Sequence, residues 1–350
     1  MAERRAHGRA LENLARWLWT SGSAGAAIAR TLLAPASLAY RMVHGVRTWL
    51  YDDGVLAIRS AAVPVISVGN LTVGGSGKTP FAAWLITRLL QQQRKPALLH
   101  GGYAGDEPEL HRQWHPDVPV WAGRERVVSA REAVANGADV LVLDDGFQHR
   151  RLGRDADIVL VAAEQWSRRR LLLPAGPWRE PASALQRANI IVITRKAASS
   201  EHAATVAREV QAFAGMTAPV AIAAILPSGW RTGRGTSAGP ATGVAGLAAP
   251  PGEVVAVAGI ARPDLFAANA AASGAHIVAS FWFPDHHTYD RDDAGRITTG
   301  AGGRAIVTTA KDALKLEPLL PAGRLWVLEQ DVHIERGAEA LDAVVQRALS

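Results

Sequence analysis

Residues 70–80 have the sequence Asn70-Leu71-Thr72-Val73-Gly74-Gly75-Ser76-Gly77-Lys78-Thr79-Pro80. The apolar run before them, residues 63–68, predicts a buried strand, and residues 81–90 after them predict a helix. A strand, a glycine-rich loop, Gly-Lys-Thr and a helix follow one another in proteins that bind nucleotide phosphates. The glycines let backbone N–H groups approach phosphate oxygens, and the helix N-terminus adds unpaired donors. The stretch therefore predicts a phosphate-binding loop.

Two side chains of this loop have expected roles. Lys78 would reach the β- and γ-phosphates of a bound nucleotide, and the Thr79 hydroxyl would hold Mg²⁺. One position departs from the strict motif, because Thr72 stands where the first motif glycine is expected. The alternative is a glycine-rich turn with a surface lysine. The residues expected around the nucleotide are Thr72, Val73, Gly74, Gly75, Ser76, Gly77, Lys78 and Thr79.

The composition limits the possible classes of protein. The chain has 350 residues, which favours two domains, and it has no cysteine, which excludes disulfides and cysteine-ligated metals. Its net charge is +6 and its isoelectric point is about 10.0. This positive charge is compatible with binding to nucleic acid, to an anionic membrane surface or to a phosphorylated substrate. It is equally compatible with a protein whose charge only keeps it soluble.

Residues 1–60 predict a separate N-terminal segment. Within it, one face of a predicted helix is apolar, and Arg41, His44 and Arg47 fall on the other face. The uncharged apolar runs are shorter than the ~18–20 residues that a spanning helix needs. A membrane-surface helix and an ordinary amphipathic helix packed on the domain both remain open. The apolar positions are Leu32, Ala36, Ala39, Val43, Val46 and Leu50.

Carboxylates follow two of the predicted strands. Asp106 comes after the strand at residues 96–99 and a glycine-rich turn, and Asp144 and Asp145 end the strand at residues 139–143. Parallel sheets place ligands at the carboxyl ends of their strands. We therefore expect Asp144 and Asp145 to hold Mg²⁺. Asp106 and Glu107 are candidate base or metal residues, although an acidic pair in a turn is also common as a solvated loop or helix cap.

The remaining pattern predicts an α/β fold with a mostly parallel, doubly wound sheet flanked by helices, like that of P-loop NTPases. Short apolar strands alternate with helices through residues 61–226, which we expect to form the nucleotide-binding domain. Gly, Ser, Thr and Pro dominate residues 227–252, which predicts a connector. A second α/β pattern over residues 253–350 predicts a smaller domain, in which Asp285-His286-His287 could support a carboxylate base or could simply cap a helix.

Six motifs, taken in order, resemble the tetraacyldisaccharide 4′-kinase family, which phosphorylates a lipid A precursor. The resemblance covers nearly the whole chain, and the family also has Thr at the position of Thr72. The motifs are Val68 to Pro80, Gly105-Asp106-Glu107-Pro108, Asp144-Asp145-Gly146-Phe147-Gln148-His149, Leu173-Pro174-Ala175-Gly176-Pro177-Trp178-Arg179-Glu180, Asp285-His286, and Thr309-Ala310-Lys311-Asp312-Ala313.

The resemblance implies an ATP- and Mg²⁺-dependent kinase that phosphorylates the 4′-hydroxyl of a tetraacylated glucosamine disaccharide 1-phosphate. It implies that Asp106 acts as base with His286, and that Gln148 and Arg179 contact the nucleotide. It also implies that Glu180 joins Thr79, Asp144 and Asp145 at the metal. The expected partners are this lipid and the membrane surface, with no nucleic acid. The expected location is the cytoplasmic face of the bacterial inner membrane, bound peripherally through the N-terminal helix.

One departure from the family leaves alternatives open. The family usually has Ser-Arg-Gly-Tyr-Gly-Gly and then a dozen or more residues before Gly-Asp-Glu-Pro, whereas here His100-Gly101-Gly102-Tyr103-Ala104-Gly105 leads directly into Asp106. A non-catalytic descendant that binds lipid or nucleotide is therefore one alternative. A P-loop GTPase or metallochaperone is another, although Lys311 and Asp312 are adjacent and lack the spacing of a guanine-binding motif.

Overall fold

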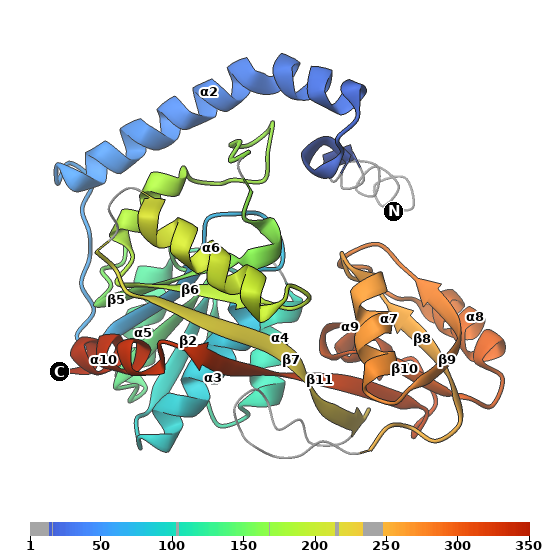
Figure 1. The fold of residues 1–350 in the computed structure, drawn as a ribbon. Coiled ribbons are helices and arrows are strands. Elements are labelled where there is room, and N and C mark those ends of the chain that lie inside the picture. The colour runs from blue at the N-terminus through green and yellow to red at the C-terminus, as the bar shows by residue number, and fades with distance from the viewer. Residues whose placement is uncertain (1–13, 16, 103–104, 168, 214–216, 234–247) are drawn as a thin grey trace.

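The structure is a computed structural model that describes residues 14–15, 17–102, 105–167, 169–213, 217–233 and 248–350. In this part of the chain eleven strands form one sheet, in the order β3-β2-β4-β1-β5-β6-β7-β11-β10-β8-β9. Neighbouring strands are parallel except for the antiparallel pair β7 and β11. Figure 1 shows two bodies side by side, joined by these two long strands. The expected mostly parallel α/β fold is confirmed.

The strands are β1 (Val65–Asn70), β2 (Pro96–His100), β3 (Val120–Ala122), β4 (Val140–Asp144), β5 (Ala156–Ala162), β6 (Ile190–Arg195), β7 (Val220–Thr232), β8 (Glu253–Ala258), β9 (His276–Trp282), β10 (Ala305–Thr309) and β11 (Leu325–Arg336). The helices are α2 (Ala24–Asp52), α3 (Lys78–Gln91), α4 (Asp106–Trp114), α5 (Arg126–Ala135), α6 (Ser200–Ala212), α7 (Pro263–Ala272), α8 (Arg291–Ala301), α9 (Ala310–Leu316) and α10 (Ala338–Leu349).

The first body has three layers, because alternate side chains of its buried strands face opposite helices. On β1, Ile66 and Val68 belong to a core with α3 and α10, whereas Val65 belongs to a core with α5. On the same side as α5, α6 covers β5 and β6. Every residue of β1, β2, β4 and β5 is buried. The phosphate-binding loop therefore grows out of a rigid, fully buried strand.

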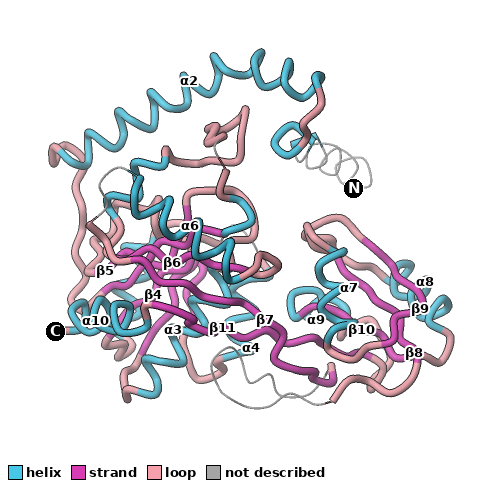
Figure 2. The backbone as a smooth tube through the Cα atoms, viewed as in Figure 1, coloured by secondary structure: helices cyan, strands magenta, loops and turns pink. Residues whose placement is uncertain are grey.

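The strands β7 and β11 bring the carboxyl ends of the two half-sheets toward each other. β6 runs parallel to β7 as far as Ala224, and β10 runs parallel to β11 as far as Leu328. Within the antiparallel pair, Ala224 is opposite His333 and Leu328 is opposite Trp230. Both half-sheets thus end near the middle of the same two-stranded ribbon, which crosses both bodies in Figure 2. Ligands bind at the carboxyl ends of parallel strands, so the two edges of the sheet that would bind ligands face each other. The region between these edges, which holds Asp106, His286 and Lys315, is called the cleft.

Two of the expected domain limits need correction. β7 continues through residues 227–232, which the composition assigned to a connector. Pro227 is tolerated there because the ladder shifts register between Glu329 and Gln330, next to its partner position. The helix α10 was expected in the second domain, but its apolar side chains join the core of the first body. Residues 1–13, 16 and 234–247 of the expected N-terminal segment and connector lie outside the described residues.

Candidate active site between the two half-sheets

The phosphate-binding loop joins β1 to α3, and its shape is fixed by β6 and β7. Gly77 has φ +86°, and a Cβ placed on it would lie 2.1 Å from Cδ1 of Ile225. Glycine is needed here both for the left-handed backbone and for the close approach of β7. The Thr194 hydroxyl at the end of β6 donates to the Ser76 carbonyl at 2.8 Å. The loop is therefore positioned for a ligand by the sheet itself.

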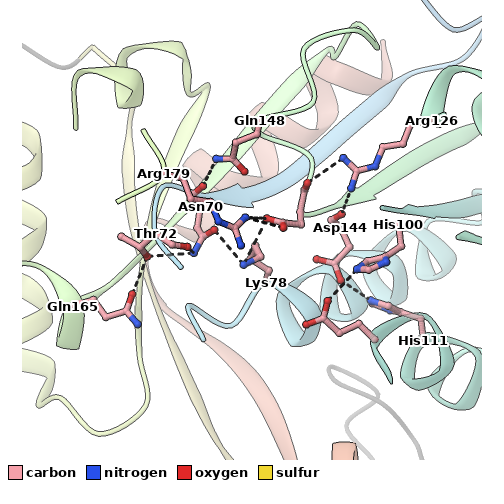
Figure 3. Close-up of polar contacts among 12 residues, drawn as sticks. Asn70, Thr72, Lys78, His100, His111, Arg126, Asp144, Gln148, Gln165 and Arg179 are labelled. Carbon is pink, nitrogen blue, oxygen red and sulfur yellow. Dashed lines mark hydrogen bonds and ion pairs between the residues drawn. The ribbon is translucent and has the colours of Figure 1, made fainter. Parts of the chain in front are cut away.

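Thr72, the departure from the strict motif, contributes to this network. Its hydroxyl donates to Oε1 of Gln165 at 2.9 Å, and Nδ2 of Asn70 donates to its carbonyl at 2.9 Å (Figure 3). A glycine at this position would lose the first of these bonds. Thr72 thus ties the loop to the segment that follows β5.

Lys78 lies at the centre of a network of predicted site residues (Figure 3). Its Nζ donates to Oδ1 of Asn70 at 3.1 Å and lies 3.6 Å from the Asp145 carboxylate. Arg179 donates to the same carboxylate at 3.0 Å. Burial alone would raise the pKa of Asp145, but the charges of Lys78 and Arg179 outweigh burial and lower that pKa. Gln148 donates to the Asn70 carbonyl at 2.7 Å. The predicted site residues Lys78, Asp145, Arg179 and Gln148 therefore lie in one network.

Asp144 and Asp145 are adjacent but have different surroundings. Asp145 has φ +56°, and this left-handed turn separates the directions of the two side chains. Asp144 is 1% exposed, and its Oδ2 lies 3.1 Å from Nε2 of His111. Arg126 fixes the turn by donating to the carbonyls of Asp144 and Asp145 at 3.2 and 3.1 Å. Oδ1 of Asp144 is buried and has no hydrogen-bond partner among the described residues.

The donors at this end of the sheet suit Mg²⁺. The metal prefers oxygen ligands, and Thr79 at the start of α3, Asp144 and Asp145 offer a hydroxyl and two carboxylates. The unpartnered Oδ1 of Asp144 is an acceptor that a cation would satisfy. Glu180 is placed differently, because its carboxylate accepts from Arg187 at 2.7 Å and lies 3.5 Å from His44. Its contacts are with these two side chains and not with the carboxylates after β4.

A second group of possible metal ligands consists of His100, Glu107 and Asp144, whose ligand atoms lie within 4.8 Å of one another. The hydrogen bonds of His100 argue against a metal there. Its Nδ1 accepts from the Gly102 N–H at 3.1 Å, so its proton lies on Nε2, which faces Glu107 at 3.0 Å. An imidazole nitrogen that carries a proton cannot ligate a metal. The group is a hydrogen-bonded support for the start of α4.

Asp106 is the first residue of α4, and it meets residues of the second body. Its Oδ2 lies 2.6 Å from Nζ of Lys315 on α9 and 3.5 Å from Nδ1 of His286, which follows β9. Burial would raise the pKa of Asp106, but the hydrogen bonds from His286 and Lys315, with the charges of Lys315 and Lys311, lower it to about 2. Asp106 is therefore ionised at neutral pH. The two predicted residues of the dyad do meet across the cleft.

The helix α2 lies along one side of the first body (Figure 1) and contacts it mainly through polar groups. Ser37 donates to the Leu172 carbonyl at 3.0 Å and Tyr40 donates to the Arg179 carbonyl at 2.8 Å. The apolar positions face outward: Leu32 is 75% exposed and Val43 is 70% exposed. Ala36, Ala39 and Val46 are exposed too, whereas Leu50 is half-buried. Among the described residues, no helix is long and apolar enough to cross a membrane.

Several residues of this cleft were missed by reasoning from the sequence. Arg126, His111 and Lys315 carry no motif of their own, and Lys311 lies in the motif Thr309 to Ala313 without an expected role. Their contacts form only where α4, α5 and α9 meet the strand ends. One signal was present, since Lys311 and Lys315 are four residues apart and so share one face of a helix.

Known proteins resemble this chain over most of its length. A family model described as tetraacyldisaccharide-1-P 4′-kinase matches residues 29–350. A tetraacyldisaccharide 4′-kinase of Anaeromyxobacter dehalogenans is 37% identical over 367 residues, covering 95% of this chain and 94% of the relative. That of Halorhodospira halophila is 35% identical over 331 residues, covering 89% and 91%.

A solved structure is similar over almost its whole length. It is the "apo" form of LpxK from Aquifex aeolicus in complex with ATP, with a TM-score of 0.72 and 30% identity, covering 92% of this chain and 99% of that chain. The chain belongs to the tetraacyldisaccharide 4′-kinase family.

Proposed function

We propose that this chain transfers the γ-phosphoryl group of ATP to the 4′-hydroxyl of a tetraacylated glucosamine disaccharide 1-phosphate, with Asp106 as the acceptor of the hydroxyl proton. Family membership supports the reaction and the substrate class. The observation that carries the proposed site is its position in the fold. The phosphate-binding loop and Asp106 both follow strand ends of the first half-sheet, and the residues that hold the Asp106 carboxylate come from the facing half.

The nucleotide side of the cleft supplies positive charge. Lys78 and Arg179 now share the carboxylate of Asp145, and a bound polyphosphate would offer both of them a second anionic partner. Phosphoryl transfer needs little covalent work from the protein, and depends on positioning and on neutralising the charge that develops. Thr79, Asp144 and Asp145 would hold Mg²⁺, which would screen the phosphate charge when bound.

The acceptor side supplies orientation. Asp106 has a pKa of about 2, so its carboxylate is ionised and accepts a hydrogen bond from a hydroxyl. Such a weak base orients the hydroxyl first and takes the proton late, which suits a transition state in which the attacking oxygen has little bond formation. His286 faces the same carboxylate and fixes its direction.

We further propose that α2 holds the protein at the cytoplasmic face of the inner membrane without spanning it. The support is the direction of its apolar face, since Leu32, Val43 and Val46 are exposed while Ser37 and Tyr40 bind the domain. An ordinary amphipathic helix would place those apolar residues against the domain. Net positive charge favours an anionic lipid surface.

The alternative of a P-loop GTPase is not favoured. Asp312, the acidic residue of the supposed guanine-binding motif, is fully buried and accepts bonds from the Gly259 N–H, Tyr289 and Thr309. It stabilises the second body and is not free to bind a base.

The proposed reaction is tested with labelled ATP and a disaccharide 1-phosphate lipid under single-turnover conditions. We expect a new phosphate on the distal sugar of the lipid. A protein that binds ATP and the lipid but transfers no phosphate would instead be the non-catalytic descendant that the short segment before Asp106 suggests.

A further inference from the structure

The two oxygens of the Asp106 carboxylate are not equivalent. Oδ2 lies 2.6 Å from Nζ of Lys315 and 3.5 Å from Nδ1 of His286. Both contacts are ion pairs to Oδ2, which is buried, and the described residues form no hydrogen bond to Oδ1. The Lys315 ammonium has a second anchor, because it donates to the His287 carbonyl at 3.0 Å. One oxygen is therefore fixed and the other is available.

A second lysine fixes the hydrogen bonding of His286. Nζ of Lys311 lies 3.0 Å from Nε2 of His286, and an ammonium group can only donate. Nε2 must then carry the lone pair, which places the ring proton on Nδ1, on the side of Asp106. The ring N–H of His286 is then on the side of Oδ2 of Asp106, 3.5 Å away.

We propose that Lys315 is a positioning residue for phosphoryl transfer, which pins Oδ2 of Asp106 so that Oδ1 is presented to the acceptor hydroxyl. The inference rests on the proposed role of Asp106. An aspartate carboxylate at the start of a helix can rotate about its side-chain bonds, and misplacement by ~1 Å can cost a reaction ~10²-fold. The ion pair removes that freedom.

The same ion pair joins the two bodies. Asp106 begins α4 in the first body, and Lys315 lies near the end of α9 in the second, and these helices pack together. In the reaction, the hydroxyl oxygen forms a bond to the γ-phosphorus while the bond to the β–γ bridging oxygen breaks and ADP leaves. The hydroxyl proton goes to Oδ1 of Asp106 and later to solvent, so Lys315 keeps its own proton throughout.

The test compares Lys315→Met, which keeps the length of the stem and removes the charge, with Lys315→Arg, which keeps the charge. We expect Lys315→Met to lower kcat ~10–100-fold with the KM for ATP unchanged, and Lys315→Arg to recover a large part of that loss. Lys95→Met, at an exposed lysine before β2, is the matched control and should leave kcat unchanged. If Lys315→Met does not fold, Lys315→Gln takes its place.

A double mutant separates positioning from direct substrate binding. In an Asp106→Asn background, Lys315→Met should change the single-turnover rate less than ~3-fold, because the two residues act as one unit. A full Lys315→Met effect in that background would overturn the inference and assign Lys315 to the substrate. A kcat within twofold of wild type in Lys315→Met would also overturn it. If Asp106→Asn alone keeps wild-type activity, the proposed role of Asp106 fails instead.

Discussion

At the scale of single residues, three carboxylates of the cleft are held in three ways. Asp145 lies between Lys78 and Arg179, Asp144 is buried against His111, and Asp106 is anchored by Lys315. Asp144 and Asp145 lie at the end of β4, beside the phosphate-binding loop, and suit a metal. Asp106 faces the second body. Their substitutions should therefore have different kinetic signatures.

Asp106→Asn should lower turnover ~10²–10⁴-fold and leave the affinity for ATP nearly unchanged, because Asn keeps the shape but cannot take a proton. Asp145→Asn should lower turnover and also raise the Mg²⁺ concentration that gives half-maximal rate. The measurements are single-turnover rates and nucleotide binding over a Mg²⁺ titration. The same Mg²⁺ dependence in both variants would contradict the division of roles.

His115 predicts a dependence of stability on pH. It is 6% exposed, and burial with the nearby His111 lowers its pKa to about 4. The unfolded chain takes up a proton below pH ~6.5, whereas the folded protein does not do so until about pH 4, so stability is lost as pH falls through this window. We expect this group to contribute up to ~3 kcal/mol. Urea unfolding at pH 7 and pH 5 should show a smaller loss in His115→Asn than in wild type, and equal losses would refute the assignment.

Residues within a continuous motif could be predicted from the sequence, and residues brought together by packing could not. Lys78, Asp145, Arg179 and Gln148 form one network, as their motifs indicated. Glu180, expected at the metal with them, contacts Arg187 and His44. The contact of Lys315 with Asp106 forms between α9 and α4, which are far apart in the sequence. No local sequence pattern can therefore predict it.

At the scale of elements, α2 is unusual because its polar side chains bind the domain and its apolar side chains face outward. A group of neighbouring apolar side chains exposed to solvent generally marks an interaction site. The helix has Pro35 in its interior and still continues from Ala24 to Asp52.

Val43→Glu should reduce binding to vesicles of anionic phospholipid ~10-fold or more, because it places a charge on the face proposed to enter the membrane. The variant should melt at the wild-type temperature, since Val43 is 70% exposed. Vesicle flotation measures binding, and Gln91→Glu, at an exposed position at the end of α3, is the control for added negative charge. Undiminished binding by Val43→Glu would show that α2 is not the membrane contact.

Neither α4, beside the cleft, nor α8, in the second body, was predicted from the sequence pattern. At the start of α4, Asp106-Glu107-Pro108 suggested a turn, although acidic residues and proline are also typical of a first helical turn. At the start of α8, Asp290 and Asp293 form a reciprocal capping box. The second half of β11 contains polar residues such as Gln330 and Asp331, which do not continue the apolar pattern of a buried strand.

At the scale of the whole molecule, the two-stranded ribbon of β7 and β11 determines how the two half-sheets are oriented. Because it is antiparallel and long, it turns two parallel half-sheets so that their carboxyl ends face each other. One half brings the phosphate-binding loop, and the other brings His286, Lys311 and Lys315. The residues of the two halves already meet at Asp106, which contacts both His286 and Lys315.

The most direct test of this arrangement is single-turnover transfer of labelled phosphate from ATP to the disaccharide 1-phosphate lipid, comparing wild type with Lys78→Ala. Lys78 begins α3 beside the loop and supplies charge rather than core packing, so the variant should fold normally. We predict a new lipid phosphate with wild type and a rate at least ~10³-fold lower with Lys78→Ala. Undiminished transfer by folded Lys78→Ala would contradict the assignment of the phosphate-binding loop.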